Sequence, residues 1–234
     1  MNIEKNTVSA QSQTQKGGIE IVDNGGKYNV LFVGNSITRH APKNEIGWKH
    51  DWGMAASAKD KDYVHVTVKL LEEKLGKVNY AIVNCANWER LYYQDEVLET
   101  FAEVKAFHAD IIVIRLGENL WSANEHFALY PIPPHYAKMV EFFVVNPNAK
   151  IVLTDLFWKN TTINEAIHTV AKEKGYALVP LSDLGCNEEN TAIGKFWHEG
   201  VAMHPGDIGM QRIAERIAKK ILETISFYPP FSSK

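Results

Sequence analysis

A serine stands directly after an apolar run near the start of the chain. The run YNVLFVG (28–34) leads into GNSIT, in which Ser36 follows Gly34 and Asn35. Glycine permits a sharp turn at a strand end, and a serine just beyond it can point its hydroxyl out of the sheet. If a helix begins there, its N–H groups face any anion formed at the hydroxyl. Ser36 is therefore a candidate nucleophile, although a serine that only caps the next helix fits the same letters.

Two other polar residues stand where they could assist such a nucleophile. In RLGENLW, Asn119 follows Gly117 just past another apolar run, and its side-chain amide could donate to a developing oxyanion. A simple turn built on glycine and asparagine is the alternative. His204, in HPGD, lies in a loop before the last helical segment and is a candidate general base. A solvated loop histidine is the alternative here.

The elements that must position these residues are five buried strands alternating with helices. Continuous apolar, β-branched runs of this kind are typical of strands buried on both faces of a parallel sheet. The runs are 28–34, 78–84, 110–116, 149–155 and 176–181. Segments with helical periodicity lie between and after them, at 63–76, 135–145, 164–175 and 207–225.

This alternation predicts a three-layer α/β/α sandwich with a mainly parallel five-stranded sheet of the flavodoxin-like kind. Ligands of such sheets bind beyond the carboxyl ends of the strands. Ser36 and Asn119 both follow strand ends, so we expect the chemistry to lie at that edge.

Composition limits the classes of function. The chain has 234 residues, 45% hydrophobic and 23% charged, with a formal charge of −3. No basic stripe predicts a nucleic-acid partner, and no apolar run of membrane-spanning length appears. Cys85 and Cys186 follow neither a metal spacing nor a disulfide framework, so no metal or other cofactor is expected.

The beginning of the chain is polar and carries no apolar stretch typical of a secretory signal, which predicts a cytoplasmic location. We expect residues 1–26 to be a flexible lead-in, because they are rich in Gln, Ser, Thr and Gly. Residues 27–234 are expected to form one domain. The sequence does not indicate an oligomeric state.

Taken together, these motifs resemble the SGNH branch of the GDSL esterases and lipases, from about residue 28 onward. The family's nucleophile motif GDSIT appears as GNSIT, its G-x-N-D motif as Gly117 to Leu120, and its closing D-x-x-H-P motif as Val201 to Pro205. The resemblance implies catalysis by Ser36 and His204 without a cofactor. It implies an oxyanion hole made by the N–H groups of Ser36 and Glu89 and by the side chain of Asn119.

Two departures from the family pattern concern acidic residues. Glu89 occupies the place of a glycine, and a carboxylate close to a developing negative charge is unfavourable unless it is paired or turned away. Arg90 and Arg115 are candidate partners. The acid of the triad should lie three residues before the histidine, where this chain has Val201.

Three acids in the same half of the chain could take over from the missing triad acid. Glu199 is the first choice because it shares the loop of His204, with Asp183 and Asp207 as alternatives. A backbone carbonyl could also hold the imidazole in a Ser–His dyad.

All six tryptophans fall in the segments expected at the catalytic edge of the sheet. They are Trp48, Trp52, Trp88, Trp121, Trp158 and Trp197. Tryptophans that pack the loops down are one explanation, and an aromatic cleft suited to sugar rings is the other. On the second, we expect Trp88, Trp121 and Trp158 to bind substrate, together with Asn35 and Gly117.

These observations favour a serine ester hydrolase that removes an acetyl or another small acyl group from a small or oligosaccharide ester. A sugar O-acyltransferase would use the same residues. A non-catalytic carbohydrate-binding descendant is the third hypothesis, motivated by Val201 and Glu89.

Overall fold

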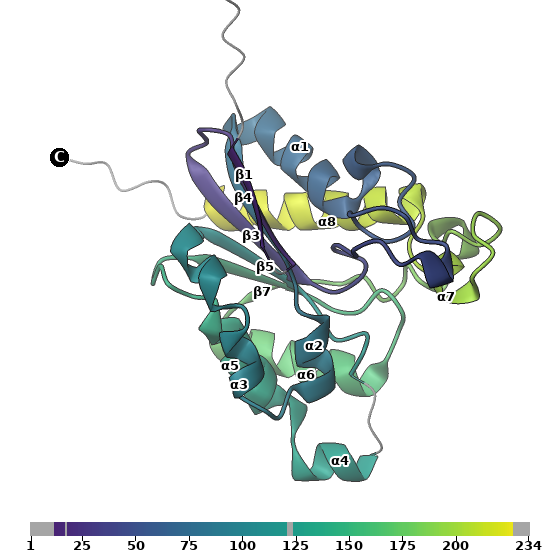
Figure 1. Ribbon diagram of the computed structural model, residues 1–234. Coiled ribbons are helices and arrows are strands. Elements are labelled where there is room, and N and C mark those ends of the chain that lie inside the picture. Colours follow the sequence, from purple (N-terminus) through teal and green to yellow (C-terminus); the bar gives the residue numbers. More distant parts are fainter. Residues whose placement is uncertain (1–11, 17, 121–123, 227–234) are drawn as a thin grey trace, which may run out of the picture.

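The computed structural model describes residues 12–16, 18–120 and 124–226 and is built on one seven-stranded sheet (Figure 1). The strands lie in the order β1-β2-β4-β3-β5-β6-β7. Their bounds are Ser12–Lys16 (β1), Ile19–Asp23 (β2), Tyr28–Gly34 (β3), Val78–Asn84 (β4), Ile111–Arg115 (β5), Lys150–Thr154 (β6) and Ala177–Val179 (β7). The five strands from β3 to β7 run parallel and coincide with the five predicted runs. The predicted mainly parallel sheet is confirmed.

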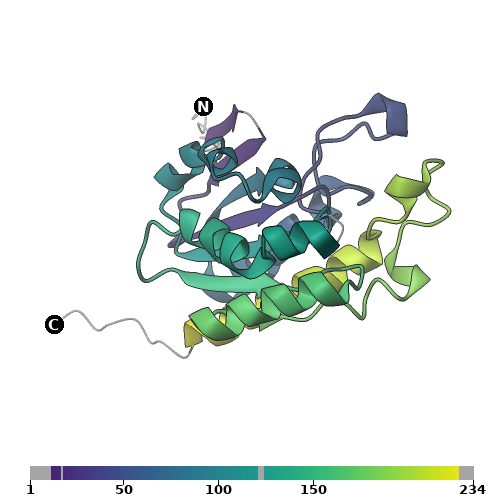
Figure 2. The same ribbon diagram turned by 90° about the horizontal axis from the view of Figure 1, so that it is seen from below.

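Helices cover both faces of the sheet, which confirms the predicted three layers. In Figures 1 and 2, α1 and α8 lie on one face, whereas α2, α3, α5 and α6 lie on the other. The bounds are Tyr63–Leu75 (α1), Ala86–Leu91 (α2), Glu96–Glu99 (α3), Asn124–Leu129 (α4), Ile132–Phe142 (α5), Thr161–Lys174 (α6), Glu199–Ala202 (α7) and Asp207–Ser226 (α8). Short 3-10 turns occupy Asn44–Ile46, Lys59–Lys61, Ala102–Phe107 and Glu188–Asn190. Within the described residues, none of these helices has both the length and the apolar character needed to cross a membrane.

Local signals explain where the longer helices begin and end. The carboxylate of Asp62 accepts the N–H of His65 and so caps α1, which ends before Gly76. The side chain of Asn160 accepts from Ile163 in the same way at the start of α6, and Gly175 closes that helix in a left-handed conformation. These caps fix the lengths of the helices that cover the sheet.

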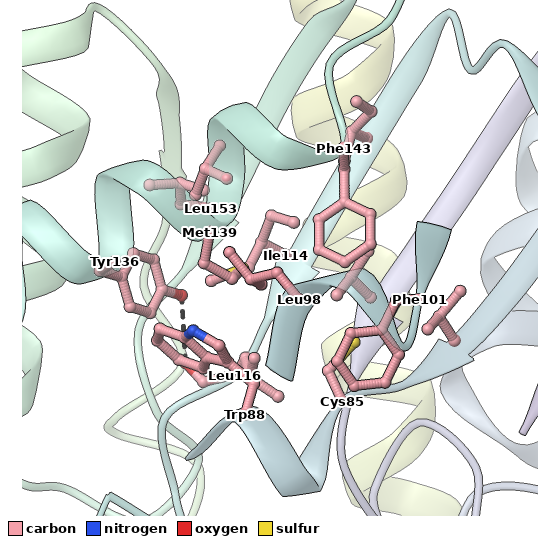
Figure 3. Packing of buried hydrophobic residues seen from close by; sticks show 14 of the residues in the cluster. Cys85, Trp88, Leu98, Phe101, Ile114, Leu116, Tyr136, Met139, Phe143 and Leu153 are labelled. Carbon is pink, nitrogen blue, oxygen red and sulfur yellow. Dashed lines mark hydrogen bonds between the residues drawn. The ribbon is translucent and has the colours of Figure 1, made fainter. Parts of the chain in front are cut away.

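A large apolar core lies between the sheet and helices α2, α3, α5 and α6. Figure 3 shows Trp88 of α2 and Tyr136 of α5 beside one another, with the Tyr136 hydroxyl donating to the Leu116 carbonyl at 3.1 Å. Leu116 follows β5 directly, so this bond holds the start of the 117–119 loop against the core. The core therefore holds the loop after β5 in place at the edge of the sheet where the candidate site lies.

The prediction of a flexible lead-in over residues 1–26 is wrong for the described part of that segment. β1 and β2 pair antiparallel with each other, and β2 pairs antiparallel with β4, with Ile19 opposite Val83. The polar composition of the segment concealed the short run IEIVD, in which Ile19 and Val22 are buried. Residues 1–11 lie outside the described residues.

Truncating one of these side chains tests whether β2 belongs to the folded domain. Ile19 is 5% exposed, so we expect Ile19→Ala to lower the free energy of unfolding by about 2–4 kcal/mol. Urea denaturation measures this, with Lys69→Ala on the exposed side of α1 as a control that changes stability by no more than about 0.5 kcal/mol. Equal stabilities of both variants would show that the segment is a loose lead-in.

Candidate active site

The turn after β3 presents the Ser36 hydroxyl at the carboxyl edge of the sheet. Gly34 is required there because a Cβ atom would lie 1.8 Å from Thr38 Oγ1. The Ser36 carbonyl accepts from Met54 N at 2.9 Å, which anchors the turn. Within the described part of the chain, the Ser36 N–H donates to no acceptor. A serine whose amide is free and whose hydroxyl is half-exposed has the geometry that acyl transfer needs.

His204 lies against this serine although the two are far apart in the sequence. Ser36 Oγ and His204 Nε2 are 2.8 Å apart, and His204 Nδ1 lies 2.6 Å from the Gly200 carbonyl oxygen. A carbonyl oxygen only accepts hydrogen bonds, so Nδ1 carries the proton in the neutral ring. Nε2 is then left as an acceptor for the serine hydroxyl, which is the tautomer that a general base requires.

No acid holds His204, contrary to the expectation for Glu199. Among the described residues, His204 Nδ1 bonds only to the Gly200 carbonyl, which lies in α7 directly after Glu199. The two other acids are engaged elsewhere: Asp183 by Arg216, and Asp207 by Ser57 and Lys61. The geometry is that of a Ser–His dyad held by backbone, the alternative that the sequence left open.

Val201, at the position of the missing acid, faces an apolar cluster. It is fully buried with Trp48, Met54, Ala55 and Ala192. The helical turn of α7 therefore sends this side chain into the core and leaves the Gly200 carbonyl to meet the imidazole. A valine fits that environment better than a carboxylate, whose charge would be left without a partner.

The surroundings of His204 favour its neutral form. Burial lowers the pKa of His204 to about 4, and the positive charges of Arg115 and His40 act in the same direction. The hydrogen bond to Gly200 and the charge of Glu118 oppose this shift. The ring is therefore neutral near pH 7 and able to accept a proton.

Asn119 is near the site, but its side chain is engaged by Glu89. Asn119 Nδ2 donates to Glu89 Oε2 at 2.5 Å, and the Asn119 backbone N–H donates to Glu89 Oε1 at 3.2 Å. An amide nitrogen carries two protons, so one N–H of Asn119 stays available for a second acceptor. The half-exposed position of Asn119 allows that acceptor to be a substrate oxygen.

The expected oxyanion donor at Glu89 N stays a prediction. Glu89 is the fourth residue of α2, and Cys85 is the residue that precedes the helix. The Cys85 carbonyl accepts from Trp88 N at 2.9 Å, and no acceptor for the Glu89 N–H is found among the described residues. Where the family pattern has a glycine, this chain has a short helix that carries Glu89.

The Glu89 side chain belongs to a buried polar network beneath the site. It is 2% exposed and accepts from Asn35 Nδ2 at 3.0 Å and from Gly117 N at 2.6 Å, in addition to Asn119. Burial and the neighbouring charge of Glu118 raise the pKa of Glu89, while its hydrogen bonds oppose the rise. Neither expected arginine bonds it: Arg90 bonds Asn87, and Arg115 bonds Asn35 and Glu118.

The predicted substrate contacts of Asn35 and Gly117 are also wrong. Asn35 is 1% exposed, and its side chain is occupied by Glu89, Glu118 and Arg115. Gly117 is buried at φ +140°, a backbone conformation open to glycine, and its N–H is taken by Glu89. Both residues hold the frame of the site and do not face a ligand.

The tryptophans that the structure describes lie in different environments, and Trp52 is half-buried against the cluster of Trp48. Trp48 and Trp88 are buried in the core, so the expected substrate contact of Trp88 is wrong (Figure 3). Trp121 lies outside the described residues. Trp158 is half-buried with its ring 5.3 Å from that of His204, and Trp197 is 75% exposed in the segment leading to α7. Of the three tryptophans expected to bind substrate, Trp158 is the one that the structure shows beside His204.

Three contacts at the site were not predicted: those of Arg115 with Asn35 and with Glu118, and that of the Gly200 carbonyl with His204. Arg115 interrupts the apolar run IIVIRL and is fully buried, with Glu118 Oε1 2.5 Å from its Nη1. A charge inside a buried strand requires a partner, so this run carried a usable signal. Nothing in the sequence indicated the role of the Gly200 carbonyl. Among the described residues, no group of three or more His, Cys, Asp or Glu side chains could hold a metal ion.

Comparison with known proteins identifies the fold. No family model and no curated protein matches the chain. Solved structures do match it, among them a carbohydrate esterase family 3 protein from Talaromyces cellulolyticus. It is 16% identical with a TM-score of 0.56, and the match covers 86% of this chain and 100% of that one.

Other matched structures agree with this one. A family two carbohydrate esterase from Cellvibrio japonicus is 15% identical with a TM-score of 0.55, over 87% of this chain and 63% of that one. An acetyl xylan esterase is 17% identical with a TM-score of 0.51, over 82% and 98%. Structures described as GDSL-like lipases also match. The expected SGNH/GDSL hydrolase fold is confirmed.

The lowered pKa of His204 can be tested without a substrate. We expect NMR signals of its ring, identified by their loss in His204→Gln, to report the neutral form from pH 8 down to pH 5. An unfolded histidine takes up its proton near the ordinary pKa of 6.5, and the folded one only near 4. The unfolded state therefore binds more protons between these values, and stability should fall as the pH drops through this range. A titration midpoint near 6.5 would contradict the burial argument.

Restoring an acid at position 201 tests the packing explanation. Because Val201 is fully buried among apolar side chains, Val201→Asp should lower the free energy of unfolding by about 3 kcal/mol or more. It should not make Ser36 more reactive. Val201→Thr, which keeps the shape of the side chain without a charge, is the matched control and should cost less. A stable, faster-reacting Val201→Asp variant would show that this position can reach His204.

Proposed function

We propose that this chain is a serine ester hydrolase acting on small acyl esters of a carbohydrate, through an acyl intermediate on Ser36. The observation that carries the proposal is the 2.8 Å contact between Ser36 Oγ and His204 Nε2. The Gly200 carbonyl supports it by fixing the tautomer of the ring.

The proposed reaction begins with proton transfer from Ser36 to His204. As the serine oxygen attacks the ester carbonyl, Nε2 accepts the hydroxyl proton and the ring becomes an imidazolium. The oxyanion accepts hydrogen bonds from the Ser36 N–H and from the second side-chain N–H of Asn119. The imidazolium then protonates the leaving alcohol, and water releases the acid from the acyl-serine in the second half-reaction.

The dyad stabilises the imidazolium less than a triad would. A backbone carbonyl presents a dipole to Nδ1–H, whereas an aspartate presents a full charge. Burial also lowers the pKa of His204 to about 4, which disfavours the protonated ring. We therefore expect a modest turnover, with an activity that persists at acidic pH values where an ordinary histidine would already be protonated.

The choice of a carbohydrate substrate is supported by two observations. Matched structures of the same fold are described as carbohydrate esterases and as an acetyl xylan esterase. Trp158 lies edge-on to the ring of His204, and Trp197 exposes most of its ring in the same region of the chain. Exposed aromatic rings suit the apolar faces of sugars.

Non-catalytic sugar binding is the second candidate function. One observation favours it: the carboxylate of Glu89 lies on Asn119, where an esterase stabilises negative charge. Acyl transfer to a second sugar uses the same residues as hydrolysis. The two reactions are therefore distinguished by their products and not by their residues.

Labelling with a fluorophosphonate probe tests for an activated serine. We expect wild-type protein to be labelled, Ser36→Ala to lose the label completely, and His204→Ala to react at least about 100-fold more slowly. Ser57→Ala, an exposed serine that bonds Asp207, is the control and should label like the wild type. A well-folded wild type that takes no label would support the binding function.

Hydrolysis then identifies the substrate class. Acetylated sugars and nitrophenyl acetate should be cleaved faster than long-chain nitrophenyl esters, and the acid should be released into water even when free sugar is present. Equal rates on short and long acyl chains would remove the basis for a small acyl group. Transfer of the acyl group to added sugar would identify a transferase.

A further inference from the structure

The buried carboxylate of Glu89 is surrounded by hydrogen-bond donors. Glu89 Oε1 accepts from Asn35 Nδ2, Gly117 N and Asn119 N at 3.0, 2.6 and 3.2 Å. Its Oε2 accepts from Asn119 Nδ2 at 2.5 Å. All four partners are donors, so an ionised carboxylate can accept a hydrogen bond from each of them. A protonated carboxyl group would instead direct its own proton toward a donor.

This arrangement fixes which way the Asn119 amide points. The two ends of an amide are nearly the same in shape and differ only in donating or accepting. An ionised carboxylate can only accept, so Nδ2 of Asn119 must face it and Oδ1 must turn away. One N–H is used in this bond, and the other keeps a single defined direction.

The same carboxylate fixes the loop that carries Asn119. It holds the backbone N–H groups of Gly117 and Asn119, while Asn35 joins it to the strand end beside Ser36. Arg115 bonds the other end of the Asn35 amide at 2.6 Å, which fixes the orientation of Asn35 as well. The nucleophile turn and the Asn119 loop are thus tied to one buried group.

We propose that Glu89 is a positioning residue that sets the orientation of the Asn119 amide, so that its free N–H is directed at the oxyanion of the substrate. This inference rests on the proposed function. It assigns a use to the acidic side chain at the position where the resemblance implies a glycine. Glu89 acts through Asn119 and does not touch the substrate.

Kinetics of a double-mutant cycle test this coupling. Glutamine keeps the shape of Glu89 but presents an N–H to the surrounding donors, so at least one of the four bonds is lost in Glu89→Gln. We expect its kcat to fall about tenfold or more with KM within about twofold, because the oxyanion exists only in the transition state. Asn119→Ala should lose about 100-fold in kcat.

The double variant should be no slower than Asn119→Ala within about threefold, because the proposal has the effect of Glu89 on catalysis pass through that amide. Full additivity of the two losses would overturn the proposal. Glu72→Gln is the matched control, a half-buried carboxylate that accepts the Val78 N–H far from the site, and it should keep wild-type kcat.

An NMR measurement of the Asn119 side-chain amide separates this inference from the proposed function. In the wild type we expect one of its protons to lie downfield and exchange slowly, and in Glu89→Gln to lose both properties. If the wild type proves inactive yet shows this change, the proposed function fails and the positioning stands. If the wild type is an active esterase and the amide signal is unchanged in Glu89→Gln, the positioning is overturned alone.

Discussion

The buried guanidinium of Arg115 imposes the constraint on which the rest of the site depends. Arg115 ends β5 in the centre of the sheet and is fully buried, so its charge needs partners at the carboxyl edge. It finds Glu118 three residues later and the side chain of Asn35 at the end of the neighbouring strand β3. The bonds that neutralise Arg115 therefore also join the turn of Ser36 to the loop of Asn119.

A second constraint explains why the histidine is held by backbone. In α7 the side chain of Val201 enters the apolar cluster around Trp48, and the preceding carbonyl of Gly200 is left to meet His204. The core packing and the hydrogen bond are made by consecutive residues of the same short helix. An acid at position 201 would have to leave that cluster to reach the imidazole, so the dyad follows from the packing.

Periodicity in the sequence was sufficient to predict the layers and the strands of the parallel sheet, because apolar runs and helix caps are local properties. It was also sufficient to place Ser36 and Asn119 at one edge, since the carboxyl ends of parallel strands share that edge. The short strand β2 was missed because its apolar run is short and is interrupted by Glu20, which is buried together with Ile19 and Val22.

Side-chain directions at the site could not be predicted in the same way. Whether Trp88 faces a cleft or the core depends on a helical turn at α2 that directs it toward Tyr136. The same turn buries the side chain of Glu89. The position of Arg115 inside an apolar strand signalled a buried partner, but the sequence suggested Glu89, whereas Glu118 and Asn35 bond it in the structure.

The balance of charge beneath the site sets what the geometry can achieve. Arg115 is paired with Glu118, whereas the negative charge of Glu89 accepts hydrogen bonds from neutral donors and is attracted by Arg115 without a direct bond to it. An oxyanion formed at this edge of the sheet would be repelled by that charge. Any benefit of Glu89 to catalysis must therefore come from the orientation that it gives to the Asn119 amide and not from its own electrostatic field.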